Sequence, residues 1–219
     1  MHGGGKNIKK KLDQHNIETK FIDGLRVTDE KTIKIVEEAL LELNTEILNN
    51  IKGKEANAQS VTPKNENIIK IIPEKKELGF VGIPKESNKE VLLSIVREKK
   101  VPIIVPLGIG DDGKIYNINA DVAAAAIAKE INSRRLLLMT DVEGVLDKDK
   151  KLISEINSET ANNMIDDQSI SGGMIPKIKT CIDAVNNGVT GVVIVDGRKQ
   201  NSLLFEIFSD KGAGTLIRK

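Results

Sequence analysis

The stretch "VPIIVPLGIGDDGKIYNINADVAAAAIAKEINSRRLLLMT" (residues 101–140) decides the fold class. Residues 101–110 form a short apolar run that ends in turn residues, which predicts a buried strand. Alanine is the best helix former, so the alanine-rich segment 121–131 predicts a helix. Residues 134–141 predict a second buried strand. Buried strands that alternate with helices are typical of a parallel sheet covered by helices on both faces.

The same alternation continues on both sides of this stretch. Towards the C-terminus, helices are expected at 158–167, 172–188 and 201–209, with a third buried strand at 189–197. Towards the N-terminus, residues 88–100 read as a helix, and residues 28–51 as a long amphipathic helix that Thr28 caps. The polar stretch 52–84 contains one strand-like core, "NIIKII", and predicts a hairpin or small β excursion. Residues 18–25 predict a short strand.

Composition excludes several classes of protein. The 219 residues allow one large domain or two small ones, and a net charge of +1 gives no support to a polyanion binder. One Tyr, four Phe and no Trp argue against stacking platforms for nucleic acid. Cys181 is the only cysteine, so neither a disulfide framework nor a cysteine zinc site is expected. Without a signal peptide or an apolar run of about 20 residues, we expect a cytoplasmic protein that binds no membrane.

Polar side chains follow the predicted strands, where ligands bind in open α/β sheets. Asn117, Asn119 and Asp121 cluster in "YNINAD" (116–121), just before a helix. These three side chains could fix a substrate, although Asp121 could equally be a simple helix cap. Asp141 and Gly144 follow the next strand in "TDVEGVLD" (140–147), but the Asp-x-x-Gly pattern is also common in plain turns.

Glycines and cations at helix starts point to an anionic ligand. Lys177 lies in the first turn of a predicted helix, after Gly172 and Gly173 in "ISGGMIPK" (170–177). The helix dipole disfavours a cation there, so an anion such as phosphate is its expected partner, and a plain surface lysine is the alternative. Arg26 could bind a carboxylate with two hydrogen bonds or belong to a surface ion pair. These features fit phosphoryl transfer, without a Walker motif or the His-Arg-Asp set of protein kinases.

Seven motifs, in this order, resemble the N-acetylglutamate kinases of the amino acid kinase family: "HGGG" (2–5), "FIDGLRVTD" (21–29), "LGFVG" (78–82), "YNINAD", "TDVEGVLD", "ISGGMIPK" and "GAGTLI" (212–217). The resemblance implies an αβα sandwich around a mainly parallel sheet. It implies a single domain over 1–219, with a substrate-binding half at 1–105 and a nucleotide-binding half at 106–219. Such enzymes transfer the γ-phosphoryl group of ATP, with Mg, to the side-chain carboxylate of N-acetyl-L-glutamate. They serve arginine synthesis in the cytoplasm as homodimers or larger homo-oligomers.

The resemblance also assigns roles to individual residues. Gly4 and Gly5 would donate backbone N–H groups to the substrate and the passing phosphoryl group. Arg26 would clamp the α-carboxylate, and Asn117, with Asn119 beside it, would bind the N-acetyl amino acid. The catalytic residues would be Lys177, which neutralises the transition state, and Asp121, which orients the catalytic lysines. The nucleotide would be lined by Asp141, Val142, Gly144, Leu146, Ser171 and Gly172. No residue is assigned as a metal ligand.

Two departures from the family pattern bear on activity. The chain opens directly on "HGGG". In the family this motif is preceded by a strand that ends in a Lys-x-Gly-Gly motif, then a helix and a second strand. We expect the isolated chain to fold poorly or act weakly unless that piece is supplied. A Gly-Leu-Ser-Gly-Lys-Asp-like segment is replaced by "NAQSVTPKNENIIKI" (57–71), which predicts an altered lid hairpin.

Two alternatives to the N-acetylglutamate kinase therefore stay open. One is a non-catalytic binding or regulatory remnant, which the absent lysine favours. The other is a kinase of a related N-blocked amino acid such as N-acetyl-aminoadipate. The retained Lys177, Asp121 and Asn117 favour an enzyme.

Overall fold

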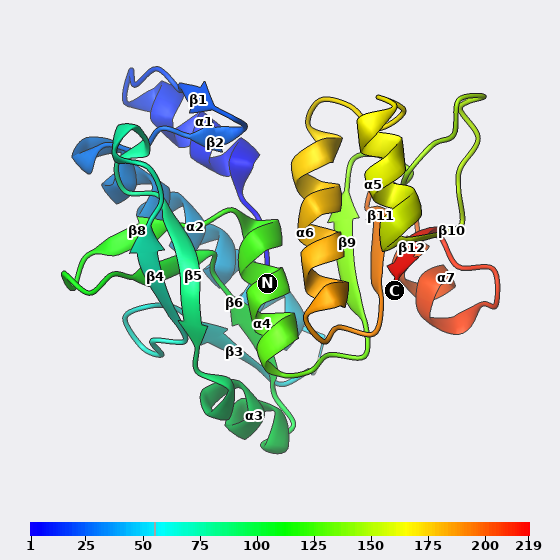
Figure 1. Ribbon diagram of the computed structural model, residues 1–219. Helices are drawn as coiled ribbons and strands as arrows, with labels where there is room; N and C mark the ends of the chain where they lie inside the picture. Colours follow the sequence, from blue (N-terminus) through cyan, green and yellow to red (C-terminus); the bar gives the residue numbers. More distant parts are fainter. Residues whose placement is uncertain (55) are drawn as a thin grey trace. The chain divides into compact units, whose positions relative to one another are not determined.

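The computed structural model describes residues 1–54 and 56–219, which divide into two compact units, Met1–Ile127 and Ala128–Lys219. Figure 1 shows the helices and strands of each unit. The division falls within a helix and lies C-terminal to the 105/106 boundary of the two predicted functional halves, which remain a prediction about function. Each unit is described separately.

The first unit contains four helices and eight short strands among the residues that the structure describes. Its helices are α1 (Gly5–Gln14), α2 (Glu30–Lys52), α3 (Lys89–Arg97) and α4 (Ala120–Glu130), with a 3₁₀ turn, η1 (Lys76–Leu78). Its strands are β1 (Phe21–Ile22), β2 (Leu25–Arg26), β3 (Ala58–Val61), β4 (Ile69–Pro73), β5 (Gly82–Ser87), β6 (Val101–Ile104), β7 (Leu107–Ile109) and β8 (Ile115–Asn117).

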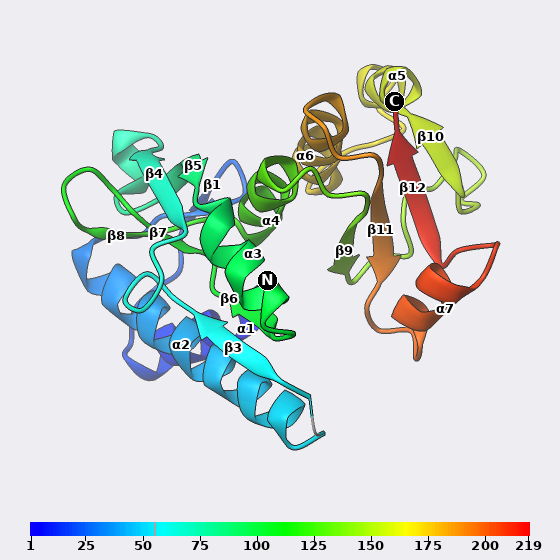
Figure 2. The same ribbon diagram turned by 90° about the horizontal axis from the view of Figure 1, so that it is seen from below.

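Parallel pairing links strands that are distant in sequence. Strands β3 and β6 pair in parallel, and a four-stranded sheet has the order β5-β4-β7-β8, with β4 and β7 parallel. The β4–β5 and β7–β8 pairs are antiparallel. The expected hairpin within 52–84 is thus present as β4 and β5. Figure 2 shows α2 running alongside β3.

Two hydrophobic clusters lie against these strands. One joins α1 and α2 to the β6–β7 segment and is centred on Leu12, Val36 and Leu40, which are completely buried. The other joins α3 and α4 to β3, β4 and β8. Since Ile104 of β6 belongs to the second cluster and Val105, directly after it, to the first, helices pack on both sides of the strands, and the predicted αβα layering is confirmed in this unit.

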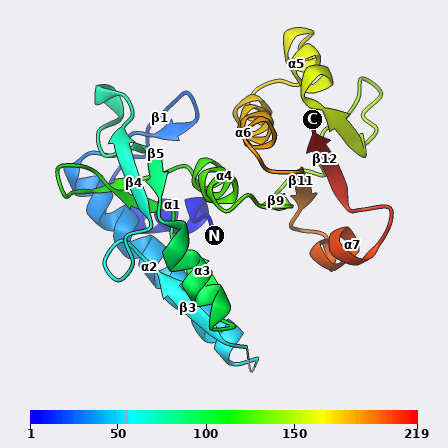
Figure 3. The ribbon, with the colours of Figure 1, turned by 60° about the horizontal axis from the view of Figure 1, so that its bottom comes forward.

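The second unit is built on one sheet in the order β10-β12-β11-β9. Its elements are β9 (Leu136–Thr140), β10 (Glu155–Asn157), α5 (Ser158–Asp166), α6 (Met174–Asn186), β11 (Val192–Asp196), α7 (Ser202–Phe208) and β12 (Gly214–Arg218). Strands β9 and β11 are parallel, and so are β10 and β12, whereas β11 and β12 are antiparallel. Figure 3 shows α5 and α6 on one side of these strands and α7 on the other.

Three local expectations need correction. The run 101–110 forms two strands in different sheets, because Pro106 between them has no N–H to donate to a ladder. Asp29, not Thr28, caps α2 by accepting a hydrogen bond from the Thr32 N–H at 2.7 Å. The hydroxyl of Thr28 instead donates to the Arg26 carbonyl. The strand β12 was not predicted, although its sequence belongs to the quoted motif "GAGTLI".

None of the described helices combines the length and the apolarity that a bilayer crossing requires.

Candidate functional site

A cavity of about 260 Å³ in the first unit brings together every residue that the sequence assigned to the acceptor substrate. Its lining includes Gly4, Gly5, Arg26, Asn117, Asn119 and Asp121. These residues come from the start of α1, the β1–β2 hairpin and the junction between β8 and α4. Chain segments about a hundred residues apart therefore meet at one cavity.

The glycine loop supplies backbone N–H groups to this cavity. Gly4 is the N-cap of α1, which has neither a side-chain cap nor an acidic residue in its first turn. The first N–H groups of a helix have no partner within the helix. Here those of Gly4 and Gly5 donate to no other described residue. The cavity thus contains free donors at the positive end of a helix, which is the arrangement that binds anions.

Close packing explains the glycine at position 4. A Cβ atom there would lie 2.6 Å from Cδ2 of Leu40, a completely buried side chain of α2. A Cβ at Gly5 would meet nothing within 4 Å. The loop is therefore pressed onto α2 at one glycine and open at the next.

Arg26 is a buried cation that has no anionic partner in the part of the chain that the structure describes. Arg26 is 9% exposed. Its guanidinium donates to the Thr19 hydroxyl at 3.1 Å and lies 4.9 Å from the centre of the Phe21 ring. Within the described residues no carboxylate pairs with it. Burial lowers the pKa of Arg26 from its ordinary value. A desolvated guanidinium that lines a cavity can bind a carboxylate by donating two hydrogen bonds to it.

The hairpin that carries Arg26 is fixed by a second motif. Asp23 and Gly24 both have positive φ, 51° and 80°, as the tight β1–β2 turn requires. Two residues after Arg26, the N–H of Thr28 donates to the Leu78 carbonyl at 2.9 Å. Gly79 then passes so close that a Cβ would lie 2.4 Å from the Thr28 carbonyl oxygen. The motif "LGFVG" therefore holds the chain beside Arg26.

The β8–α4 junction presents amide and carboxylate groups to the cavity. The N–H of Asn117 donates to the Phe80 carbonyl at 2.9 Å, while its side-chain amide bonds to no described residue. Asn119, not Asp121, caps α4, since its side-chain oxygen accepts from the N–H groups of Asp121 and Val122 at 2.9 and 3.4 Å. The alternative role expected for Asp121, that of a simple helix cap, is therefore wrong.

The predicted nucleotide segment lies in the second unit, directly after β9. Asp141, Val142 and Leu146 are exposed, whereas Gly144 is buried with φ of 144°. Thr215, from "GAGTLI", is completely buried and accepts the Val145 N–H at 2.8 Å. Its hydroxyl donates to the Ile153 carbonyl at 2.6 Å. The motif "GAGTLI" therefore holds the segment 141–146 in place, a role that the sequence alone did not indicate.

The helix α6 begins as predicted. Gly173 is its N-cap, Gly172 has a φ of 57°, and Ser171 is exposed just before them. Lys177 is the fourth residue of α6 and is half-buried. The Lys177 ammonium therefore stands in the first turn of a helix that has no acidic residue there.

The sequence analysis did not identify an ion pair between Asp196 and Arg198 at the end of β11. Asp196 is 2% exposed and accepts hydrogen bonds from the backbone N–H, Nε and Nη2 of Arg198, each at 2.9 Å. These bonds lower the pKa of Asp196 to about 2. The Gly197 N–H donates to the Thr140 carbonyl at 2.8 Å, which connects this turn to the residue before the predicted nucleotide segment. The sequence "DGR" (196–198) was the available signal.

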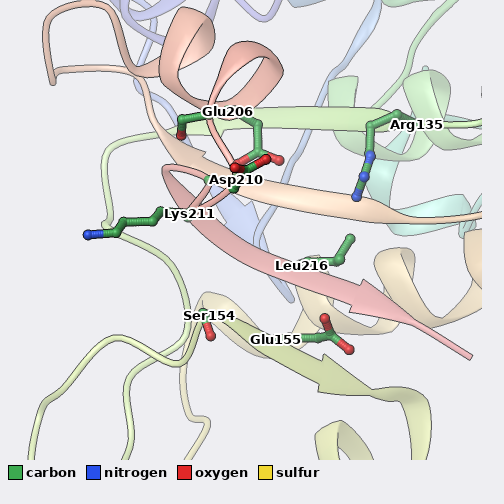
Figure 4. Close-up of a pocket in the computed structure, with 10 residues that line it drawn as sticks. Arg135, Ser154, Glu155, Glu206, Asp210, Lys211 and Leu216 are labelled. Atoms are coloured by element: carbon green, nitrogen blue, oxygen red, sulfur yellow. The ribbon is translucent and has the colours of Figure 1, made fainter.

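Other parts of the described chain offer no comparable set. No group of three His, Cys, Asp or Glu side chains in residues 1–54 and 56–219 could hold a metal ion. A cavity of about 500 Å³ in the second unit contains none of the predicted site residues. Figure 4 shows its mixed lining, which includes Arg135, Glu155, Glu206 and Asp210.

Comparison with known proteins agrees with this geometry. The profile of the amino acid kinase family matches residues 1–196. An acetylglutamate kinase of Pelagibacter ubique is 56% identical over 219 residues, which are 100% of this chain and 76% of the relative. An acetylglutamate kinase of Clostridioides difficile is 46% identical, over 100% of this chain and 78% of the relative.

A solved structure, that of smu.665 from Streptococcus mutans, has a TM-score of 0.86 and 31% identity over 99% of this chain and 84% of that one. Profile, whole-chain relatives and fold all agree with the α/β class read from the sequence. The chain thus belongs to the amino acid kinase family and is a kinase.

Proposed function

We propose that this kinase transfers the γ-phosphoryl group of ATP to the side-chain carboxylate of N-acetyl-L-glutamate, a step of arginine synthesis. The observation that carries the proposal is Arg26, a buried guanidinium that no described carboxylate pairs with, in a cavity that also holds free backbone N–H groups. An acceptor with two carboxylates would satisfy both sets of donors at once. The named activity of the whole-chain relatives supports the same acceptor.

Each group of the acceptor has a proposed partner. Arg26 clamps the α-carboxylate with a two-pronged hydrogen bond, and the Asn117 amide binds the N-acetyl group. The N–H groups of Gly4 and Gly5 bind the side-chain carboxylate and the phosphoryl group that it attacks. Phosphoryl transfer depends on positioning and charge neutralisation, which these fixed donors supply.

The second unit is proposed to hold the nucleotide. The segment from Asp141 to Leu146 and the residues Ser171 and Gly172 line it, and the Lys177 ammonium neutralises charge on the transferring group. Asp121 lines the acceptor cavity and is the residue to which the family motif assigns the orientation of catalytic lysines. Mg²⁺ enters with the ATP phosphates, because Mg²⁺ is commonly held by substrate phosphates with few protein ligands.

The proposal is tested by ADP release from ATP and Mg²⁺ with N-acetyl-L-glutamate as acceptor, using wild type and Lys177→Ala. We expect acceptor-dependent release that Lys177→Ala lowers by about 10²–10³-fold, the usual effect of removing a charge-stabilising group. N-acetyl-L-aminoadipate, run in parallel, tests the acceptor length. Preference for it would replace the proposed acceptor, and tight acceptor binding without turnover would assign the chain a binding role instead.

A further inference from the structure

A buried asparagine connects the glycine loop to two strands. Asn44 of α2 is 1% exposed, and its side-chain NH₂ donates to the Ile103 carbonyl of β6 at 2.9 Å. Its side-chain oxygen accepts from the Ser60 hydroxyl of β3 at 2.5 Å. The same NH₂ lies 3.2 Å from Nε2 of His2, directly before the glycines that line the acceptor cavity. None of these four residues belongs to the proposed acceptor site.

The hydrogen-bond pattern around Asn44 fixes its orientation. The Ile103 carbonyl can only accept, so the group that faces it must be the NH₂ and not the side-chain oxygen. The second N–H of that NH₂ then points to Nε2 of His2. Nε2 therefore has to be an acceptor without a proton.

One protonation state of His2 satisfies every partner. With Nε2 unprotonated, the proton of the neutral ring is on Nδ1, which lies 2.7 Å from the Gly3 carbonyl oxygen and donates to it. A proton added to Nε2 would place an N–H against the N–H of Asn44. Burial lowers the pKa of His2, as does the ammonium of Met1, whereas the hydrogen bond to Gly3 raises it. Among the described residues, the Asn44 amide and the Gly3 carbonyl that contact the ring are uncharged, and the charge that acts on the ring is the ammonium of Met1.

We propose that Asn44 and His2 are positioning residues that hold the glycine loop in its anion-binding geometry only while His2 is neutral. The bridge runs from β6 through Asn44 to the His2 ring, and from the ring to the Gly3 carbonyl. Its consequence for acceptor binding rests on the proposed function. The protonation state of His2 is independent of it.

The first test reads the ring directly. The chain has two histidines, and the exposed His15 serves as an internal reference for the nitrogen NMR signals. At pH 8 we expect His2 to carry its proton on Nδ1. In Asn44→Asp a carboxylate would face Nε2, so the pKa of His2 should rise above its wild-type value. The same change at the exposed Asn50 of α2 is the matched control and should leave His2 unaltered.

The second test measures the affinity for N-acetyl-L-glutamate by calorimetry at pH 7.5 and pH 5.0. The wild type should bind about tenfold more weakly at the lower pH, because binding would then require His2 to lose its proton. His2→Gln keeps an acceptor for Asn44 and cannot be protonated, so it should bind with little pH dependence. This variant leaves the buried core intact, so it remains informative if Asn44→Asp does not fold.

A proton on Nε2 of His2 at pH 8, or an equal loss of affinity at pH 5.0 in His2→Gln and wild type, would overturn the inference. If the wild type binds no N-acetyl-L-glutamate at either pH, the proposed function fails, and the NMR result alone decides whether the bridge exists.

Discussion

Arg26 is the residue at which we expect acceptor binding to be gained at the expense of stability. The residue is only 9% exposed, and its cation is desolvated without compensation from any carboxylate of the described residues. Replacing Arg26 by Met should therefore raise the melting temperature of the free protein while abolishing acceptor binding. Arg97→Met, at a side chain that is 71% exposed in the same unit, should change neither quantity. A lower melting temperature in Arg26→Met would show that the arginine is a structural residue.

Gly4 and Gly5 form a matched pair of positions. Gly4→Ala should destabilise the protein by about 1–3 kcal/mol, because its methyl group would overpack against buried Leu40. Gly5→Ala adds its methyl group to open space and should leave stability unchanged. Urea denaturation midpoints of the two variants measure the difference. Equal effects would mean that the loop is not pressed onto α2 as described.

At the scale of elements, Thr215 of β12 holds the turn that follows β9. Thr215→Val keeps the shape of the side chain but leaves the Val145 N–H without its 2.8 Å acceptor, so it should cost about 1–3 kcal/mol. Thr215→Ser keeps the hydroxyl and should lose less. If the segment binds the nucleotide, Thr215→Val should also raise the KM for ATP more than that for the acceptor. An unchanged unfolding free energy in Thr215→Val would contradict the role given to this hydroxyl.

The end of β11 should make stability depend on pH in the acid range. Hydrogen bonds from Arg198 lower the pKa of Asp196 from 3.8 to about 2 in the folded protein. A carboxyl whose pKa is lower in the folded state stabilises it above the unfolded-state pKa. That stabilisation is lost as the pH falls from about 4 towards 2. Melting temperatures of wild type and Asp196→Asn should therefore differ at pH 5 and converge near pH 2, and a constant gap would contradict this assignment.

At the scale of the whole molecule, local patterns predicted the α/β class and most helices. The helix α2 follows from its apolar spacing, and α4 from its run of alanines. The motifs also predicted which residues would meet, since Gly4, Arg26 and Asn117 line one cavity. Such features depend on residues close in sequence or on a set of family motifs, so they can be predicted from a single amino-acid sequence.

Other features depend on which segments meet in space. The apolar run 101–110 is divided at Pro106 into two strands that pair in different sheets. The cap of α4 is Asn119 and not Asp121. The separation of Arg26 from the carboxylates of the described residues depends on where the fold places each of them. The contacts that Thr215 and Asn44 make lie 70 and 59 residues away along the chain. No local pattern contains such information.

The most direct test of the central claim is to trap the product. An acyl phosphate reacts with hydroxylamine to give a hydroxamate, so wild type with ATP, Mg²⁺ and N-acetyl-L-glutamate should form N-acetylglutamyl hydroxamate. Formation should depend on the acceptor and be lost in Arg26→Met, whereas Arg97→Met should match wild type. No hydroxamate from folded wild-type protein, or equal yields from wild type and Arg26→Met, would contradict the account.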